Sequence, residues 1–167
     1  MEKAASISDT SSVVLRDVIA SDLPTFFEHQ LDPEANWMAA FTTKDPTNKD
    51  AFMAHWTRIL ADEANTNQTI LFDGQVVGHV SSYRNEHGQL EVTYWIGRTD
   101  WGKGIASKAL SLFLDYIKVR PLYARAAQDN IGSLRVLEKC GFTRIGENED
   151  FANARRTEIK EYILRLD

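Results

Sequence analysis

The sequence is poor in cysteine and has no long apolar stretch. Cys140 is the single cysteine among 167 residues, so no disulfide can form within the chain and nothing indicates an oxidising compartment. No run of about 18 apolar residues is present, and the first residues lack the basic start and apolar core of a signal peptide. We therefore expect a cytoplasmic protein with no membrane partner.

Residue patterns typical of metal and nucleic-acid binding are also missing. The four histidines have no metal-ligand spacing, so no metal is expected, and the absence of a basic stripe argues against nucleic acid as a partner. The net charge of −5 is uneven. Residues 1–75 hold twelve acidic and five basic side chains, whereas residues 76–167 hold twelve and fourteen. This asymmetry suits a cationic acceptor and a polyphosphate donor.

A glycine-rich loop between a strand and a helix is the most informative feature. The strand is expected over Leu90–Ile96, and residues 101–104 (Trp-Gly-Lys-Gly) precede an amphipathic helix. Unpaired N–H groups at a helix start, next to glycine, form a site for phosphate. A P-loop is excluded because Gly104 follows Lys103 where serine or threonine is required. A dinucleotide fingerprint is excluded because Ser107 stands at the third glycine position.

Two motifs together point to a family. In the loop, Gly104 and Ala106 fill the last two fixed positions of the pattern Gln/Arg-x-x-Gly-x-Gly/Ala, and Trp101 stands where Gln or Arg is usual. Residues 130–142 read NIGSLRVLEKCGF and match the pattern N-x-x-S-x-x-V-L-E-K-x-G-F. Both motifs resemble the GCN5-related N-acetyltransferase (GNAT) family, in its branch near the ribosomal-protein N-terminal acetyltransferases.

The expected elements agree with the fold that this resemblance implies. Their order is β-α-α-β-β-β-α-β-α-β-β, with residues 32–50 irregular. We expect an α+β fold in α/β/α layers, with a mixed, mostly antiparallel sheet of six to seven strands and about four helices. A flexible tail over residues 1–12 precedes a single domain over residues 13–167. The exposed final strands leave a homodimer open.

The resemblance implies transfer of an acetyl group from acetyl-CoA to a primary amine by direct attack in a ternary complex. The acceptor is a protein N-terminus or a small molecule. An alternative from another class is a non-catalytic acyl-CoA-binding sensor or regulatory module. Two departures from the family pattern favour it: Trp101, and Leu137 at a position where many members carry tyrosine.

The donor site is expected at the glycine loop and its flanking elements. The resemblance implies that the backbone of Ile96 serves the pantetheine arm. Asn130 is expected to cap its helix, and the resemblance implies that it also touches this arm. The backbone that would cradle the pyrophosphate comprises Trp101, Gly102, Lys103, Gly104, Ile105 and Ala106.

Two residues are the leading catalytic candidates. Glu91 is the lone carboxylate of its strand and can accept the amine proton directly or through water, although a cross-strand ion pair is an equal alternative. His79 is a second candidate for the base. For the acid, the resemblance points to Ser133, with Tyr94 and Tyr123 in reserve.

The acceptor pocket is expected to form from the N-terminal helices. Asp32, Glu34 and Asp45 carry the charge to hold an ammonium group. The aromatic residues that either line this pocket or belong to the core are Phe26, Phe27, Trp37, Phe41 and Trp56.

Overall fold

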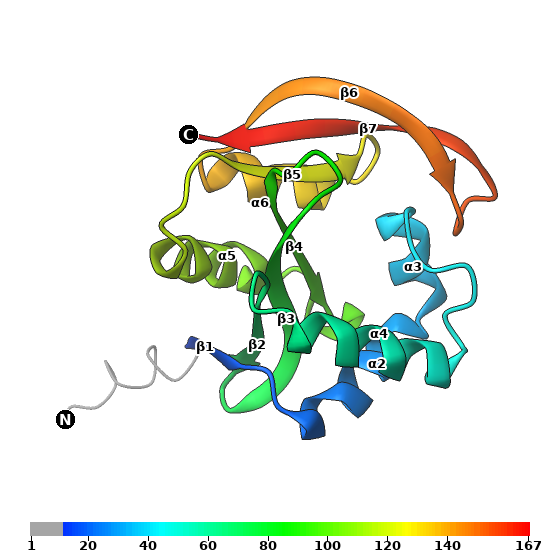
Figure 1. Cartoon of the computed structure of the whole chain (residues 1–167), viewed down its shortest axis with the longest axis vertical. Coiled ribbons are helices and arrows are strands. Elements are labelled where there is room, and N and C mark those ends of the chain that lie inside the picture. The colour runs from blue at the N-terminus through cyan, green and yellow to red at the C-terminus, as the bar shows by residue number, and fades with distance from the viewer. Residues whose placement is uncertain (1–11) are drawn as a thin grey trace.

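The computed structural model describes residues 12–167, which form a seven-stranded sheet with helices on both faces (Figure 1). The sheet order is β1-β2-β3-β4-β5-β7-β6, and every neighbouring pair is antiparallel except β4 and β5. The strands are β1 (Val13–Asp17), β2 (Thr66–Phe72), β3 (Gln75–Arg84), β4 (Leu90–Ile96), β5 (Leu122–Ala127), β6 (Thr143–Ala152) and β7 (Thr157–Leu166).

Within these residues the helices are η1 (Ala20–Asp22), α2 (Leu23–Gln30), α3 (Pro33–Ala39), α4 (Lys49–Ala61), η2 (Arg98–Asp100), α5 (Ile105–Tyr116) and α6 (Ile131–Lys139). Figure 1 shows α5 and α6 on one side of the sheet and α2, α3 and α4 on the other. The expected layered α+β architecture is therefore confirmed. One expectation is wrong: residues 32–50 are not wholly irregular, because α3 forms there and brings the α-helices to five.

The divergence of β4 and β5 positions the site. These two parallel strands share one register pair, Glu91 with Tyr123, and then separate toward their C-terminal ends. Helix α5 connects them, as parallel neighbours require a crossover. Among residues 12–167, the far half of β4 is consequently paired on its β3 edge only.

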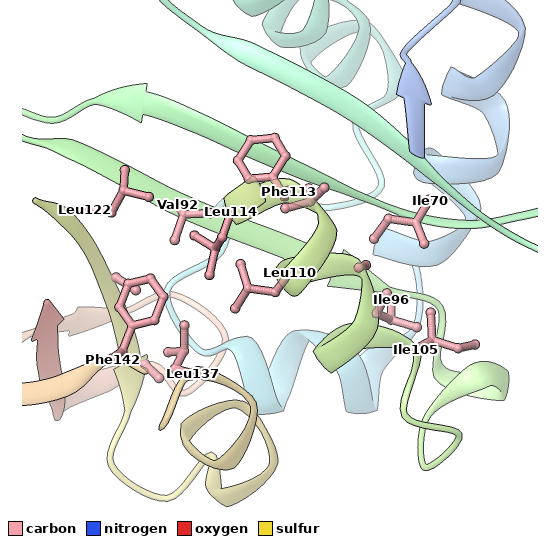
Figure 2. Close-up of a cluster of buried hydrophobic side chains, with 14 of the residues drawn as sticks. Ile70, Val92, Ile96, Ile105, Leu110, Phe113, Leu114, Leu122, Leu137 and Phe142 are labelled. Atoms are coloured by element: carbon pink, nitrogen blue, oxygen red, sulfur yellow. The ribbon is translucent and has the colours of Figure 1, made fainter. Parts of the chain in front are cut away.

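The main core lies between the sheet and helices α5 and α6 (Figure 2). Phe113 and Leu110 of α5 are 0% and 1% exposed, and they pack against the apolar side chains of β4 such as Val92. Leu137 of α6 and Phe142 extend the same cluster toward β5. Burial of this apolar stripe holds the start of α5 against the end of β4.

A smaller aromatic cluster covers the opposite face. Phe26 of α2 and Trp56 of α4 pack with their ring centroids 5.2 Å apart, and Phe52 joins them. His79 of β3 lies against both Phe26 and Trp56, at 4.7 and 4.9 Å between ring centroids. The N-terminal helices are thereby fixed to the face on which an acceptor was expected.

The flexible tail predicted over residues 1–12 falls almost entirely outside the described residues. No helix within residues 12–167 combines the length and the apolar composition needed to cross a membrane.

Candidate active site

The loop between β4 and α5 has a backbone suited to an anionic group. Gly102 and Gly104 have φ values of +78° and +77°, in the left-handed region that favours glycine. Gly104 is the N-cap of α5 and offers no side chain to the first turn. Within residues 12–167, the backbone N–H groups of residues 105–107 donate no hydrogen bond. These groups and the helix dipole are available to phosphate oxygens.

A cavity of about 400 Å³ lies beside this loop, between the end of β4, the first turns of α5 and α6, and α3. We call it the donor cavity. Of the residues predicted to bind the donor, seven line it: Ile96, Trp101, Gly102, Gly104, Ile105, Ala106 and Asn130. Lys103 does not line it, and its ammonium group pairs with Asp100 at 3.0 Å. The binding roles of all eight stay predictions.

The open edge of β4 faces this cavity. The N–H of Gly97 donates to the carbonyl of Val77 on β3 at 2.9 Å. Because successive residues of a strand direct their backbone groups to alternate sides, the N–H and C=O of Ile96 point away from β3. The indole N–H of Trp101 donates to that carbonyl at 2.9 Å. The N–H of Ile96 is left for a ligand in the gap between β4 and β5.

These features fit an acyl-CoA. An extended pantetheine arm pairs naturally with an unpaired strand edge, and a pyrophosphate suits free N–H groups at a helix start. Arg98 is not free to approach it in this structure, since its guanidinium pairs with Asp32 at 2.6 Å.

A second cavity of about 960 Å³, here the acceptor cavity, lies on the side of the sheet that faces α3 and α4. Phe41 and Asp45, both predicted for an acceptor pocket, line it, together with Glu91. Its lining has five residues in common with that of the donor cavity: Ala39, Tyr94, Trp95, Asn130 and Ser133. The two cavities therefore meet at the point where β4 faces the start of α6.

Tyr94 and Ser133 form a hydrogen-bonded pair at this junction, with their hydroxyl oxygens 2.8 Å apart. Burial of the phenol raises the pKa of Tyr94 to about 12, and the hydrogen bond with Ser133 opposes that rise only in part. The pair consequently holds its protons at neutral pH. Either hydroxyl can donate to an anion that develops in the junction.

Asn130 holds Ser133 in place. Its side chain accepts a hydrogen bond from the Ser133 N–H at 3.2 Å and so caps α6, as predicted. Its amide nitrogen donates to the carbonyl of Met38 at 3.2 Å, which ties α6 to α3. The amide is thus engaged at both ends, so contact with a pantetheine arm would add to these bonds or replace one of them.

Glu91 lines the acceptor cavity within a polar network. Its carboxylate accepts hydrogen bonds from the Tyr83 hydroxyl at 2.8 Å and from the Asn85 amide at 3.1 Å. The guanidinium of Arg125, on the neighbouring strand, lies 3.4 Å away. The ion pair considered from the sequence is present, while the role of Glu91 as base stays a prediction.

Other candidates lie away from the junction. His79 and Tyr123 line neither cavity. Burial lowers the pKa of His79 to about 3, so its imidazole is neutral among the aromatic rings. Phe26 and Trp56 belong to the aromatic cluster, and Trp37 is 52% exposed.

Helix α3 is the part of the site that was not predicted. Ala35, Met38 and Ala39 form one wall of the donor cavity. Asp32 caps this helix by accepting from the N–H groups of residues 34 and 35, and Pro33 follows it. An Asp-Pro start of this kind is a helix signal, and it could have located the wall.

The comparison with known families identifies the fold and the chemistry. The acetyltransferase (GNAT) domain matches residues 12–143. An uncharacterized N-acetyltransferase of Bacillus licheniformis, p20, is 24% identical over 166 residues, covering 94% of this chain and 93% of that protein.

Solved structures agree. RimJ of Mycobacterium smegmatis, in complex with CoA-disulfide, superposes with a TM-score of 0.81 at 20% identity, covering 94% of this chain and 82% of its own. A spermidine N-acetyltransferase of Vibrio cholerae, in complex with CoA and spermine, gives 0.76 at 21% identity, covering 93% and 96%. The layered sheet with one parallel step is therefore the GNAT fold, and the protein is an enzyme of the GNAT family of acetyltransferases.

Proposed function

We propose that the enzyme transfers the acetyl group of acetyl-CoA to a primary amine, by direct attack while both substrates are bound. The observation that carries this proposal is the meeting of the two cavities at Tyr94 and Ser133. A donor and an acceptor in these cavities would approach each other beside two hydroxyl groups. The amine belongs to a protein N-terminus or to a small molecule.

The donor side is assigned to backbone groups. When bound, acetyl-CoA supplies a thioester whose carbonyl carbon an amine can attack. The free N–H groups at the start of α5 hold the phosphates, and the N–H of Ile96 stabilises negative charge on the carbonyl oxygen. Trp101 supports this role of Ile96, because its indole N–H donates a hydrogen bond to the Ile96 carbonyl and holds the end of β4 in place.

Glu91 is assigned as the base. A primary amine with a pKa of about 10 is protonated at neutral pH and must lose a proton before it attacks. Glu91 precedes Tyr94 by three residues on the same strand, which is about 10 Å at 3.3 Å per residue. The proton therefore passes to the carboxylate through water rather than directly.

Ser133 is assigned as the acid. As the carbon–nitrogen bond forms and the carbon–sulfur bond breaks, the sulfur leaves with the electron pair and takes a proton from the Ser133 hydroxyl. Tyr94, whose raised pKa keeps its phenol protonated, passes a proton to Ser133 in turn and recovers one from solvent in the acceptor cavity, so that both hydroxyls end protonated. A thiol is a moderate acid, with a pKa of about 8.5, so this help is useful without being indispensable.

The experiment is steady-state thiol release by Ser133→Ala and Tyr94→Phe. We expect kcat to fall about 10- to 100-fold for Ser133→Ala, the low end for general acid catalysis, with little change in acetyl-CoA affinity. Ser111→Ala, an exposed position on the neighbouring helix α5, is the matched control. Equal kcat values for Ser133→Ala and the control would remove Ser133 from the mechanism.

A further inference from the structure

A buried charge cluster lies along three neighbouring strands in the lining of the acceptor cavity. It consists of Glu91 of β4, Arg125 of β5 and Glu161 of β7, whose side chains are 8%, 24% and 6% exposed. The Arg125 guanidinium lies 3.4 Å from each carboxylate. These strands are consecutive in the sheet order, as Figure 1 shows, so one guanidinium spans two carboxylates.

The charges of this cluster do not balance. Two carboxylates face one guanidinium, and Glu86 approaches the same guanidinium at 4.0 Å. The remaining hydrogen-bond donors are neutral: Tyr83 and Asn85 bond to Glu91, and Asn148 bonds to Glu161. A negative charge that is removed from water without a full counter-charge is costly, and a cation in the cavity would offset that cost.

One carboxylate oxygen of Glu161 has no hydrogen-bond partner within residues 12–167. Its Oε2 accepts from Arg125 at 3.4 Å and from Asn148 at 3.0 Å. Its Oε1 receives no hydrogen bond from any residue between 12 and 167, although the residue is only 5% exposed. Because it has no such bond and is not one of the buried polar atoms without a partner, this oxygen keeps some contact with solvent. Glu161 lines the acceptor cavity, so Oε1 is an unpaired acceptor that a molecule in this cavity can reach.

We propose that the acceptor carries, besides the reacting amine, a second cationic group that Glu161 binds through Oε1. The inference rests on the proposed function and deepens it. The cluster begins at Glu91, about 10 Å along β4 from the Tyr94 and Ser133 junction, so the two cationic groups stand at opposite ends of the acceptor.

Two kinds of molecule have this chemistry: a polyamine, and a peptide N-terminus followed by a basic residue. The experiment therefore compares matched pairs of acceptors with the purified protein. Hexamethylenediamine is set against n-hexylamine, and the peptide Ser-Lys-Ala against Ser-Ala-Ala. Both reactions are followed by thiol release from acetyl-CoA. A charge-assisted hydrogen bond contributes about 1.5–3 kcal/mol, so the dicationic member of the productive pair should have a kcat/KM about 10- to 100-fold higher.

The Glu161→Gln variant isolates the site. It keeps the shape of the side chain and removes the charge, so the ratio of kcat/KM for the dication to kcat/KM for the monoamine should fall to near unity. Glu149→Gln, an exposed position on β6, is the control and should keep the full preference. Acetyl-CoA binding and the melting temperature check that each variant is folded.

The outcomes separate the two proposals. Equal kcat/KM for dication and monoamine in the parent protein, or a preference that survives Glu161→Gln, would overturn the second cationic site and leave the acetyltransferase reaction intact. The parent comparison needs no variant and so remains decisive if Glu161→Gln fails to fold. Release of thiol with no amine at all would count against the proposed function and, with it, this inference.

Discussion

Replacing Gly104 by glutamate should abolish acetyl-CoA binding. Gly104 is the N-cap of α5 and lines the donor cavity, and a Cβ built on it meets no atom within 4 Å. A side chain at this position therefore finds no steric obstacle in the protein and projects into the space assigned to the donor. The glutamate would bring a negative charge to the N–H groups that are proposed to hold phosphate.

The magnitude has two parts. The φ of +77° at Gly104 makes any side chain there cost about 1–2 kcal/mol of folding free energy. The loss of binding free energy is larger. The glutamate carboxylate and a donor phosphate about 6 Å apart repel by about 3 kcal/mol at an effective dielectric constant of 20, which corresponds to about a 100-fold weaker affinity. Steric exclusion of the phosphate adds to this loss.

The chain provides a matched control for the strain. Gly88, in the turn between β3 and β4, has a φ of +73°, meets no atom within 4 Å of its added Cβ, and lines neither cavity. Gly88→Glu should lose a similar stability, measured by urea unfolding, and keep its affinity for acetyl-CoA in calorimetry. Unchanged affinity in Gly104→Glu would refute the assignment of the α5 N-terminus as the phosphate site.

Three further predictions concern the base, an acid-sensitive contact and the core. Glu91→Gln should lose most of its turnover with acetyl-CoA affinity unchanged, and full turnover would remove Glu91 as the base. Burial raises the pKa of Asp22, but hydrogen bonds from Arg16, Ile19 and Thr69 and the charge of Arg16 outweigh it and lower this pKa to about 2. The contact therefore contributes about 2 kcal/mol above pH 4 that is lost as the pH falls toward 2, and Asp22→Asn should flatten this acid limb in unfolding measurements. Phe113→Ala should cost about 3–5 kcal/mol in urea unfolding, because the ring is fully buried.

The elements around the glycine loop could be predicted from the sequence because local signals define them. The strand Leu90–Ile96 was predicted with the bounds that the structure has. Asn130 caps α6 as its place before an apolar helical stripe indicates. Helix α3 was missed because its seven residues carry little apolar periodicity, although Asp32 and Pro33 mark its start.

The pairing of side chains across the site could not be predicted. Glu91 meets Arg125 only because β4 and β5 are adjacent, although about 30 residues separate them in the sequence. Tyr94 meets Ser133 because α6 packs over the diverging strands, although the two residues are also far apart in the sequence. Neither contact has a periodicity or a spacing that identifies it. The sequence indicated Glu91, Tyr94 and Ser133 as separate candidates and did not indicate Arg125; the fold decides which side chains meet.

The decisive measurement is thiol release from acetyl-CoA by the purified protein, against a panel of polyamines, amino acids, aminoglycosides and N-terminal peptides. We expect release with a primary amine, faster when the amine carries a second cationic group, together with an N-acetylated product of the expected mass. A protein whose melting temperature rises with acetyl-CoA, yet which releases no thiol with any of these amines, would contradict this expectation and indicate a site that binds the donor without transferring its acetyl group.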